Sequence, residues 1–387
     1  MENNYWIVDD CLIFKPSFNK NLTNYYDVIN KYKKIMFSNY NDPLIAIKTN
    51  NSYDDKYYNN YFINKFNKKI DLSNNIHLTH LTFGYKFNQE INLSNNINLT
   101  HLTFGWEFNQ EIDLSNNINL TYLTFVSDFN QKIDLSNNIN LTHLNLGWYF
   151  NQEIDLLNNI NLTHLNLGWY FNQEIDLLNN INLTHLTFGF YFNQEIDLSN
   201  NINLTYLTFV SDFNQKIDLS NNINLTHLTI GYDFNQKIDL SNNINLTHLT
   251  FGCWFNQEID FSNNINLTYL TFGDDFNQEI CIPFNIKSLT MNSCNNQYII
   301  DNLHNNIEEL IIYNNDLNLD NLPNSIKKIY IENYKKELNN LPNSIEYLEL
   351  KNYELKIKKI PKKLKTVKCD KNYKYINDFK DYEVIYY

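Results

Sequence analysis

Seven histidines recur at one position of a repeated pattern, and they are the residues best suited to metal or proton chemistry. Tyrosine holds the same position in three further copies. Stacked imidazoles could bind a metal ion, or they could change charge together near pH ~6. The ten residues are His80, His101, Tyr122, His143, His164, His185, Tyr206, His227, His248 and Tyr269.

A metal site needs ligands that converge on one point and close a coordination shell. A straight column of rings offers each histidine only its neighbours one strand away, and the adjacent position is Thr, not a carboxylate. We therefore expect no metal and no cofactor. The column is interpreted as a row of solvated flat side chains on a concave sheet. His143, His164 and His185 are candidate contacts for a partner protein on that face.

Aromatic pairs follow a recurrent glycine, at the two positions that differ most from copy to copy. Exposed aromatic clusters are typical anchors of protein interfaces. As alternatives, one residue of each pair packs under the next copy, the variation is drift, or the rings bind a carbohydrate. We expect a contiguous patch and take it as the candidate partner-binding site: Trp148, Tyr149, Trp169, Tyr170, Phe190 and Tyr191.

Patterns typical of catalysis are absent from the sequence. Glu90 corresponds to Glu111, Lys132 and Glu153 in later copies, and alternation of acid with lysine is typical of a solvated face, not of an acid/base pair. The sequence contains no glycine-rich phosphate loop, nucleophile elbow or zinc signature. We predict that the protein is not an enzyme.

These residues must be positioned by a tandem repeat. Phe-Asn recurs every 21 residues, eleven times, from Phe66 to Phe276, which indicates a stacked solenoid. Within one copy the apolar residues alternate as in short strands and do not follow helical spacing. One copy cannot bury them alone, so the copies above and below must cover them. The apolar positions expected to face inward are Phe87, Ile91, Leu93, Ile97, Leu99, Leu102 and Phe104.

Polar positions of the repeat predict its corners. Asn88 recurs after the phenylalanine, and we expect it to bond the turn backbone and the next copy. The Asn95-Asn96 pair is read as a turn that uses the tolerance of Asn for a left-handed backbone. All eight glycines share one position, which is Val126 and Val210 in two copies. Close packing or a bend, and not a left-handed backbone, is therefore expected there.

The run L-T-x-L-T-F-G-x-x-F-N-Q-x-I, as in Leu99 to Ile112, resembles the FNIP repeat, a relative of the leucine-rich repeat. The resemblance is close from Phe66 to about Ile286 and looser beyond, where Leu322-Pro323 and Leu341-Pro342 restore the family's Leu-Pro pair. Such proteins are common in social amoebae and in large DNA viruses of amoebae, and some carry an N-terminal F-box that recruits a ubiquitin ligase. The resemblance implies a protein-interaction scaffold.

The predicted fold is mainly β, a leucine-rich-repeat-like solenoid of about eleven 21-residue FNIP coils followed by 19-residue coils. Residues 1–65 are an N-terminal cap, with a degenerate F-box as the alternative. Residues 66–285 are the FNIP array, 286–370 the LRR-like coils and 371–387 a C-terminal cap. Within the caps we expect a short helix at Tyr25–Lys34 and strands at Lys34–Phe37, Leu44–Ile47 and Val384–Tyr387.

Composition narrows the class of partner. The formal charge is −13 and every basic residue is lysine, which argues against nucleic acid. We find neither a secretory signal nor an apolar stretch long enough for a membrane span. Five scattered cysteines point to a reducing compartment. We expect a cytoplasmic monomer, in the host cytoplasm if the protein is viral, that binds an unknown protein, from the host in that case. The alternative function is a substrate-recognition subunit of a ubiquitin ligase.

Overall fold

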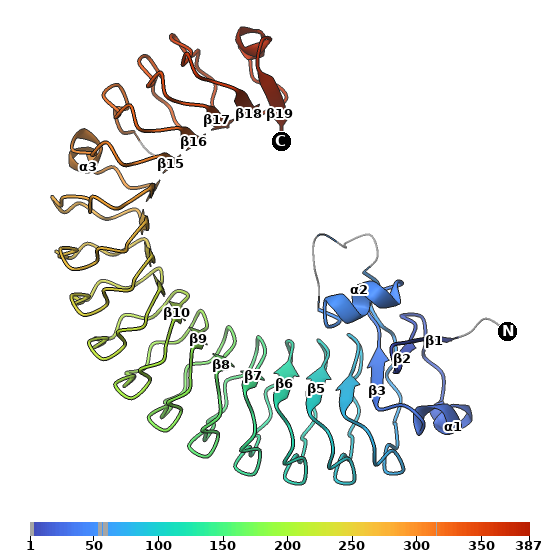
Figure 1. Cartoon of the computed structure of the whole chain (residues 1–387). Coiled ribbons are helices and arrows are strands. Elements are labelled where there is room, and N and C mark those ends of the chain that lie inside the picture. The colour runs from blue at the N-terminus through green and yellow to red at the C-terminus, as the bar shows by residue number, and fades with distance from the viewer. Residues whose placement is uncertain (1–3, 53–55, 57–60, 315) are drawn as a thin grey trace. The chain divides into compact units, whose positions relative to one another are not determined.

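The computed structural model describes residues 4–52, 56, 61–314 and 316–387. The chain forms two compact units, residues 1–204 and 205–387, and each is described by itself. Both are stacks of short parallel strands joined by loops, with few helices (Figure 1). The predicted fold class, a mainly β, leucine-rich-repeat-like solenoid, is confirmed.

In unit 1 the array strands pair in parallel with a register of one repeat, so that each residue lies beside its own counterpart. His80 pairs with His101, Leu81 with Leu102 and Thr82 with Thr103. Leu102 and Phe104 point inward and are fully buried. The strands are β4 (His80–Thr82), β5 (His101–Phe104), β6 (Tyr122–Phe125), β7 (His143–Asn145), β8 (His164–Asn166) and β9 (His185–Phe188).

The repeated phenylalanine forms the expected interior column. Phe87 stacks on Phe108 with ring centroids 6.1 Å apart, and Phe108 stacks on Phe129 at 6.1 Å. All three rings are buried. Where the strand also carries a phenylalanine, that ring stacks on the same column, as Phe104 does on Phe108 at 3.8 Å. Each layer is therefore sealed by the next through aromatic contact, as the repeat predicts.

The prediction for Ile97 is wrong. Its side chain is 52% exposed, whereas Leu93 and Leu99 on either side are buried. Two successive tight turns explain the difference: Asn96 donates its backbone N–H to Leu93 O at 2.9 Å, and Leu99 donates to Asn96 O at 3.0 Å. Ile97 is at the outer corner of the second turn, so coil stacking does not cover it.

The Asn95-Asn96 pair lies in a turn, as predicted, but the expected left-handed backbone is wrong, because neither residue adopts it. The Asn96 side chain is fully buried. The amide Nδ2 donates to two carbonyls of the preceding coil, Leu72 O at 3.0 Å and Asn75 O at 2.8 Å. The same pair of bonds recurs at Asn117. The second Asn thus ties each turn to the coil before it.

Asn88 contacts the next coil, as expected for a corner ladder. Its Oδ1 accepts the backbone N–H of Asn109 at 3.0 Å and the side-chain amide of Gln110 at 2.9 Å. The side chain is only half-buried. This ladder is therefore secondary to the fully buried column at Asn96 and Asn117.

Close packing at the glycine position is confirmed. A Cβ added at Gly105 would lie 2.0 Å from Gly84 O, and one at Gly168 would lie 1.7 Å from Gly147 O. The expectation about the backbone is wrong at Gly147 and Gly168, whose φ angles are +77° and +69°. Between residues 66 and 285, all of them described, no other residue has a positive φ.

The solenoid starts inside the segment predicted to be a cap. The strands β1 (Tyr5–Val8) and β2 (Cys11–Phe14) form an antiparallel hairpin, and β2 pairs in parallel with β3 (Lys34–Phe37), which pairs with β4. The helix expected at Tyr25–Lys34 is shorter: the 3₁₀ turn η1 (Leu22–Asn24) leads into α1 (Tyr26–Ile29). The hairpin covers one end of the stack, so only part of this segment is a cap.

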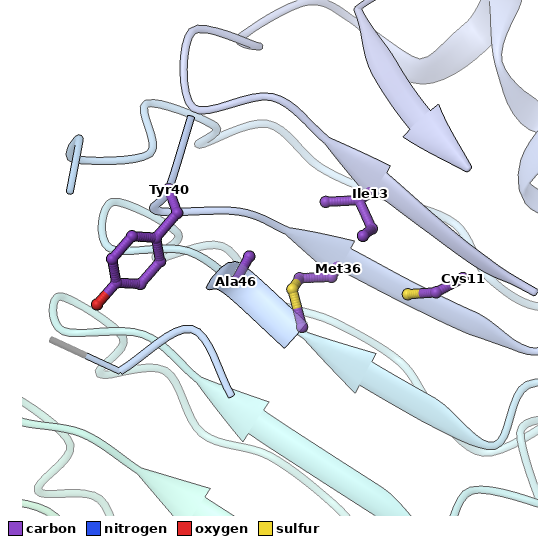
Figure 2. Close-up of a cluster of buried hydrophobic side chains, with 5 residues drawn as sticks. All are labelled: Cys11, Ile13, Met36, Tyr40 and Ala46. Carbon is purple, nitrogen blue, oxygen red and sulfur yellow. The ribbon is translucent and has the colours of Figure 1, made fainter. Parts of the chain in front are cut away.

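Leu44–Ile47 is helical, contrary to the predicted strand. The helix α2 (Pro43–Lys48) begins at Asp42, whose side chain accepts from Leu44 N at 2.8 Å, and Pro43 suits the first helical turn. It packs on the side of β2 and β3 that faces away from the core of the stack, where Ala46 joins a cluster with side chains of both strands. Figure 2 shows the resulting buried cluster of Cys11, Ile13, Met36, Tyr40 and Ala46.

Unit 2 continues with four 21-residue coils and then changes. Its strands pair in parallel throughout, from β10 to β19. The first strands are β10 (Tyr206–Phe209), β11 (His227–Ile230), β12 (His248–Phe251) and β13 (Tyr269–Phe272). They are followed by β14 (Ser288–Asn292), α3 (Gln297–Asp301), β15 (Glu309–Tyr313), β16 (Lys328–Glu332), β17 (Tyr347–Lys351), β18 (Thr366–Cys369), η3 (Ile376–Phe379) and β19 (Glu383–Tyr386).

In the later coils the backbone after each strand and the corner side chain differ from those of the array. Asn333 and Asn352 follow their strands with positive φ, and Asn352 Nδ2 donates to Asn333 Oδ1 at 2.9 Å. Tyr334 occupies the corner held by phenylalanine in the array, and its hydroxyl donates to Leu317 O at 2.7 Å. The expected C-terminal strand exists as β19, which begins and ends one residue earlier than predicted.

Candidate functional site

The histidine column is a continuous stack of rings. In unit 1 it runs through six residues, from His80 to His185, with neighbouring centroids 4.1–4.4 Å apart and planes within 17° of parallel. Tyr122 is part of the stack and contacts His101 and His143. The rings project from the first residue of each strand and are half-buried, except for Tyr122, which is exposed.

Each imidazole is oriented by the threonine before it. Thr100 Oγ1 donates to Thr79 O at 3.0 Å, and the same oxygen lies 2.9 Å from Nδ1 of His101. A hydroxyl has one hydrogen, so an oxygen that donates to the carbonyl must accept from the ring. His101 therefore carries its hydrogen on Nδ1 and has its lone pair on Nε2. The same arrangement recurs at His143 and His164.

Burial keeps these imidazoles neutral. Loss of solvation lowers the pKa of His80 to about 4, and the neighbouring His101 and Lys34 lower it further in the same direction. Loss of solvation also lowers the pKa of His143, with added repulsion from His164, His101 and His185. Protonating one ring therefore opposes protonation of the next. Burial and mutual repulsion thus disfavour joint charging near pH 6.

The stack does not provide a closed ligand set. Parallel rings aim their Nε2 lone pairs in the same direction and not at one point. Among the residues that the structure describes, no three His, Cys, Asp or Glu side chains are grouped so that they could hold a metal ion.

The six candidate aromatic residues lie side by side in two columns. Trp148 stacks on Trp169 with centroids 5.0 Å apart, and Trp169 stacks on Phe190 at 4.7 Å. In the second column Tyr170 lies 5.0 Å from Tyr149 and 4.8 Å from Tyr191. Trp148 is 41% exposed and Tyr149 is 46% exposed. We call these six residues the aromatic edge.

A local change of sequence positions two of these pairs. In the coils of β7 and β8 the strand reads His-Leu-Asn-Leu-Gly, where seven of the other eight array strands have Leu-Thr-Phe in place of Leu-Asn-Leu. Asn145 Oδ1 accepts the N–H of Gly147 at 3.0 Å, and Asn166 does the same for Gly168. These strands end at the Asn, and the following glycines have positive φ. The Trp-Tyr pairs thus leave the sheet along a path that the other coils do not use.

Smaller and charged residues bound the aromatic edge towards the N-terminus. Ser127 replaces the tryptophan of the first column and is buried, and Trp106 and Trp148 meet across it with centroids 6.3 Å apart. In the second column Asp128 precedes Tyr149, and Lys86 and Glu107 form an ion pair further along. The expected alternative, in which one residue of a pair packs under its neighbour, holds where that residue is small, as at Ser127 and Cys253.

Stacking determines which part of each ring is available. A ring inside a column has its two faces against its neighbours, so it presents its edge and any polar group to solvent. Ring edges carry partial positive charge. The surface therefore suits carbonyl and carboxylate oxygens, along with apolar groups that pack between the columns. A sugar that needs a free ring face finds few in this arrangement.

Two further columns were not singled out from the sequence. The isoleucines equivalent to Ile97 are half-exposed in seven successive coils of unit 1. Six of these seven isoleucines follow an aspartate by five residues in the sequence, and Oδ1 of one of these aspartates, Asp113, accepts the backbone N–H of Ser115 at 2.9 Å. The isoleucines were assigned to the core because their turn cannot be recognised from apolar spacing alone.

In unit 2 the solvent-facing side of strand β17 carries a charged cluster around Glu349. Its carboxylate accepts from the hydroxyls of Tyr347 at 2.6 Å and Tyr387 at 2.5 Å, and Lys368 lies 3.5 Å away. These hydrogen bonds and the lysine lower its pKa, although burial acts in the opposite direction. The acid is held ionised by its partners, and this favours a structural role.

Comparison with known proteins adds the family. The FNIP Repeat family model matches residues 313–353. The structure is similar to CroV588, a circular leucine-rich-repeat protein of a giant virus, with 30% identity and a TM-score of 0.57. That match covers 95% of this chain and 67% of CroV588. This chain belongs to the FNIP-repeat proteins, a leucine-rich-repeat family.

The family match of this FNIP-repeat chain lies in the 19-residue coils, where Leu322-Pro323 and Leu341-Pro342 occur, and not in the 21-residue array that we expected to resemble the family most closely. Two bacterial proteins share the fold: InlJ of Listeria monocytogenes (19% identity, TM-score 0.56, 93% of this chain and 68% of that one) and LIC12759 of Leptospira interrogans (13%, 0.54, 94% and 98%). Comparison with curated proteins gives no match.

None of the helices that the structure describes has the length and apolar character needed to cross a membrane. Leucine-rich-repeat solenoids are typically scaffolds for protein–protein interaction. The FNIP-repeat chain thus has a scaffold fold, with an aromatic edge and a ring column as its most unusual outward-facing features.

Proposed function

We propose that this chain is a non-enzymatic scaffold that binds a partner protein through the aromatic edge of unit 1, with the neighbouring rings of His143, His164 and His185 as secondary contacts. The observation that carries the proposal is the pair of stacked columns at Trp148–Phe190 and Tyr149–Tyr191. Tryptophan and tyrosine dominate interface hot spots, and these rings are held rigid before a partner arrives.

The neutral imidazoles fit the same function. With Nδ1 bound to threonine, each ring offers an Nε2 acceptor, and a partner supplies backbone or side-chain N–H donors. We place the protein in the cytoplasm, and in that of the host cell if it is viral; the similarity to a giant-virus protein supports a viral origin. We expect a monomer, with no role for nucleic acid.

The repeat itself supplies the test variant. Ser127-Asp128 and Ser211-Asp212 hold the same positions in other coils, so the fold accommodates Ser-Asp there. The variant Trp148→Ser, Tyr149→Asp, Trp169→Ser, Tyr170→Asp should stay folded and lose the partner. Purified wild type and variant are used as baits in native extract, and retained proteins are identified by mass spectrometry. Tyr232→Ser, at an equivalent exposed position in unit 2, is the control.

A partner retained by wild type and by Tyr232→Ser, but lost with the four-residue variant, supports the proposal. Equal retention by all three baits refutes it. A hot spot of this kind is worth about 2 kcal/mol or more per residue, so the loss should exceed roughly thirtyfold in Kd. Signal on a glycan array that the variant abolishes would instead indicate carbohydrate binding.

The ubiquitin-ligase alternative has no supporting observation. An F-box requires a helical module, whereas the described part of residues 4–65 holds α-helices of only four and six residues and two strands of the solenoid. Pulldown with the ligase adaptor is the check: adaptor retained by the full chain would revive this alternative.

A further inference from the structure

A second surface of unit 1 is apolar and acidic together. The isoleucines in the second turn of seven successive coils are 50–52% exposed, and they lie in the loops between the strands. They are Ile76, Ile97, Ile118, Ile139, Ile160, Ile181 and Ile202. We call this column the isoleucine stripe. An uninterrupted apolar row of this length is unusual on a surface that only meets water.

The stripe is built rigidly. Asn98 Nδ2 donates to Ile76 O at 2.9 Å, and Asn119 Nδ2 donates to Ile97 O at 2.8 Å. This bond recurs along the stripe as far as Asn203, which donates to Ile181 O at 2.9 Å. Each isoleucine carbonyl is thus tied to the next coil, so the side chains are held at the spacing of the coils.

A row of carboxylates accompanies the stripe. Only the four-residue turn Leu114–Asn117 separates Asp113 from Ile118, and the same turn separates Asp134 from Ile139 and Asp155 from Ile160. Hydrogen bonds from Ser115 and Ser136 lower the pKa of Asp113 and Asp134, so both stay ionised at neutral pH. Between residues 66 and 204 the chain has thirteen carboxylates and four lysines.

The polar groups of this surface mainly offer hydrogen-bond acceptors. The Asn amides beside the stripe already donate to backbone carbonyls, and carboxylates only accept. In unit 1 the array position held by Glu90, Glu111, Glu153, Glu174 and Glu195 carries lysine in two coils, at Lys69 and Lys132. A complementary partner therefore brings apolar side chains together with cationic donors.

From this combination we infer that the isoleucine stripe and its carboxylate row form a docking surface for a cationic amphipathic helix of a partner protein. A helix advances about 5.4 Å per turn, and away from the strands the phenylalanine rings of successive coils are 6.0–6.2 Å apart, so the two periods differ by less than about 1 Å per turn. One apolar residue per turn would meet one isoleucine per coil over several coils. The lysines or arginines flanking that row would meet the aspartates. This surface is separate from the aromatic edge, and either proposal can fail without the other.

The experiment uses the full chain and a synthetic helix of about 18 residues, or five turns, with a leucine face flanked by lysines. Binding is measured by fluorescence anisotropy. A scrambled peptide of the same composition tests whether charge alone is sufficient. One variant, Ile118→Ser, Ile139→Ser, Ile160→Ser, removes the apolar contacts.

A second variant, Asp113→Asn, Asp134→Asn, Asp155→Asn, removes charge with no expected loss of fold. Asn92 occupies this position naturally, and its Oδ1 accepts Ser94 N at 2.9 Å, as Asp113 accepts from Ser115. Each variant should weaken binding by at least about tenfold, which is about 1.4 kcal/mol. The aromatic-edge variant should bind the peptide as wild type does.

Failure of the full chain to bind the amphipathic peptide would overturn the inference, as would equal binding of the scrambled peptide or of either triple variant. Binding of zwitterionic lipid vesicles to the same chains is measured as the alternative. If the vesicles bind the wild type and Asp→Asn chains equally but not the Ile→Ser chain, the stripe meets a membrane surface, and the inference is wrong.

Discussion

At Gly168 a single added methyl group would prevent neighbouring coils from packing as they do. Gly168 combines two constraints: its φ is +69°, and an added Cβ would meet Gly147 O at 1.7 Å. A left-handed backbone alone costs a non-glycine residue on the order of 1–3 kcal/mol. The backbone carbonyl cannot move aside without disturbing the coil before it.

Gly168→Ala should therefore lower the free energy of unfolding by more than about 2 kcal/mol, as measured by chemical denaturation of the full chain. Val126→Ala is the control, because a β-branched residue already fits at that copy of the position. An alanine at 168 that leaves stability within about 0.5 kcal/mol of wild type would show that the coils are less tightly packed than described.

Asn117 contributes more to the free energy of unfolding than its neighbour Asn116, although the two are adjacent and identical in the sequence. Asn117 is buried and serves Leu93 O and Asn96 O, whereas Asn116 is exposed and reaches Ser94 O only at 3.5 Å. Asn117→Ala leaves two buried carbonyls without that donor, at about 1–3 kcal/mol each. Asn116→Ala should change stability by less than about 0.5 kcal/mol. Equal losses in thermal denaturation would contradict the assigned roles.

At the scale of the element, the ring column makes the array sensitive to acid. Burial holds the pKa values of His80, His101, His143 and His164 below the ordinary value near 6.5, and neighbouring rings add to this at His80 and His143. The unfolded chain then binds more protons than the folded chain below pH ~6.5. The free energy of unfolding should fall as pH drops from about 6.5 towards 4, and it should be nearly constant above that range.

The variant His101→Tyr, His143→Tyr, His164→Tyr checks this assignment, since Tyr122 shows that tyrosine fits the stack. Denaturation between pH 7.5 and 4.5 should show a much flatter dependence in the variant than in wild type. The same slope in both chains would mean that other groups cause the acid sensitivity.

Because each phenylalanine of the column contacts only its neighbours, a substitution there should destabilise mainly the adjacent coils. Phe129 lies between Phe108 and Phe150, at 6.1 and 6.0 Å, and touches no more distant coil of that column. Phe129→Ala should cost about 3–5 kcal/mol. Because coils contact only their neighbours, hydrogen exchange should accelerate most in β5, β6 and β7 and least in β2. Uniform acceleration across unit 1 would contradict this picture.

Much of the element scale could be predicted from the period alone. A fixed repeat places Phe87 on Phe108 without knowledge of any contact, and alternation identifies Leu102 and Phe104 as inward. What failed depends on turns. Ile97 is apolar and adjacent to core residues, yet two i→i−3 bonds turn it outward. Asn96 and Gly147 likewise owe their roles to hydrogen bonds between coils or to a local Asn, which spacing does not reveal.

The residues of the candidate site could be predicted from the sequence, but the arrangement of their side chains could not. Variation after the glycine identified the six aromatic residues, but their columnar stacking depends on the coil spacing. The histidine column was found through its repeat position. Its tautomer and low pKa values depend on the Thr100 hydroxyl and on burial, which the sequence does not display.

At the scale of the whole molecule, unit 1 offers two surfaces of different chemistry. The aromatic edge presents rigid ring edges and hydroxyls, and the isoleucine stripe presents apolar corners beside carboxylates. From a net charge of −13 and the absence of arginine we expect little affinity for phosphate-rich partners. Both surfaces therefore point to proteins, and the two sets of variants can separate their contributions.

The most direct test of the account is quantitative affinity capture with the four-residue aromatic-edge variant beside wild type and Tyr232→Ser. The account predicts a specific protein retained by wild type and by Tyr232→Ser and depleted at least about thirtyfold from the variant, while circular dichroism shows the same fold. Retention of the same proteins in the same amounts by all three baits would contradict it.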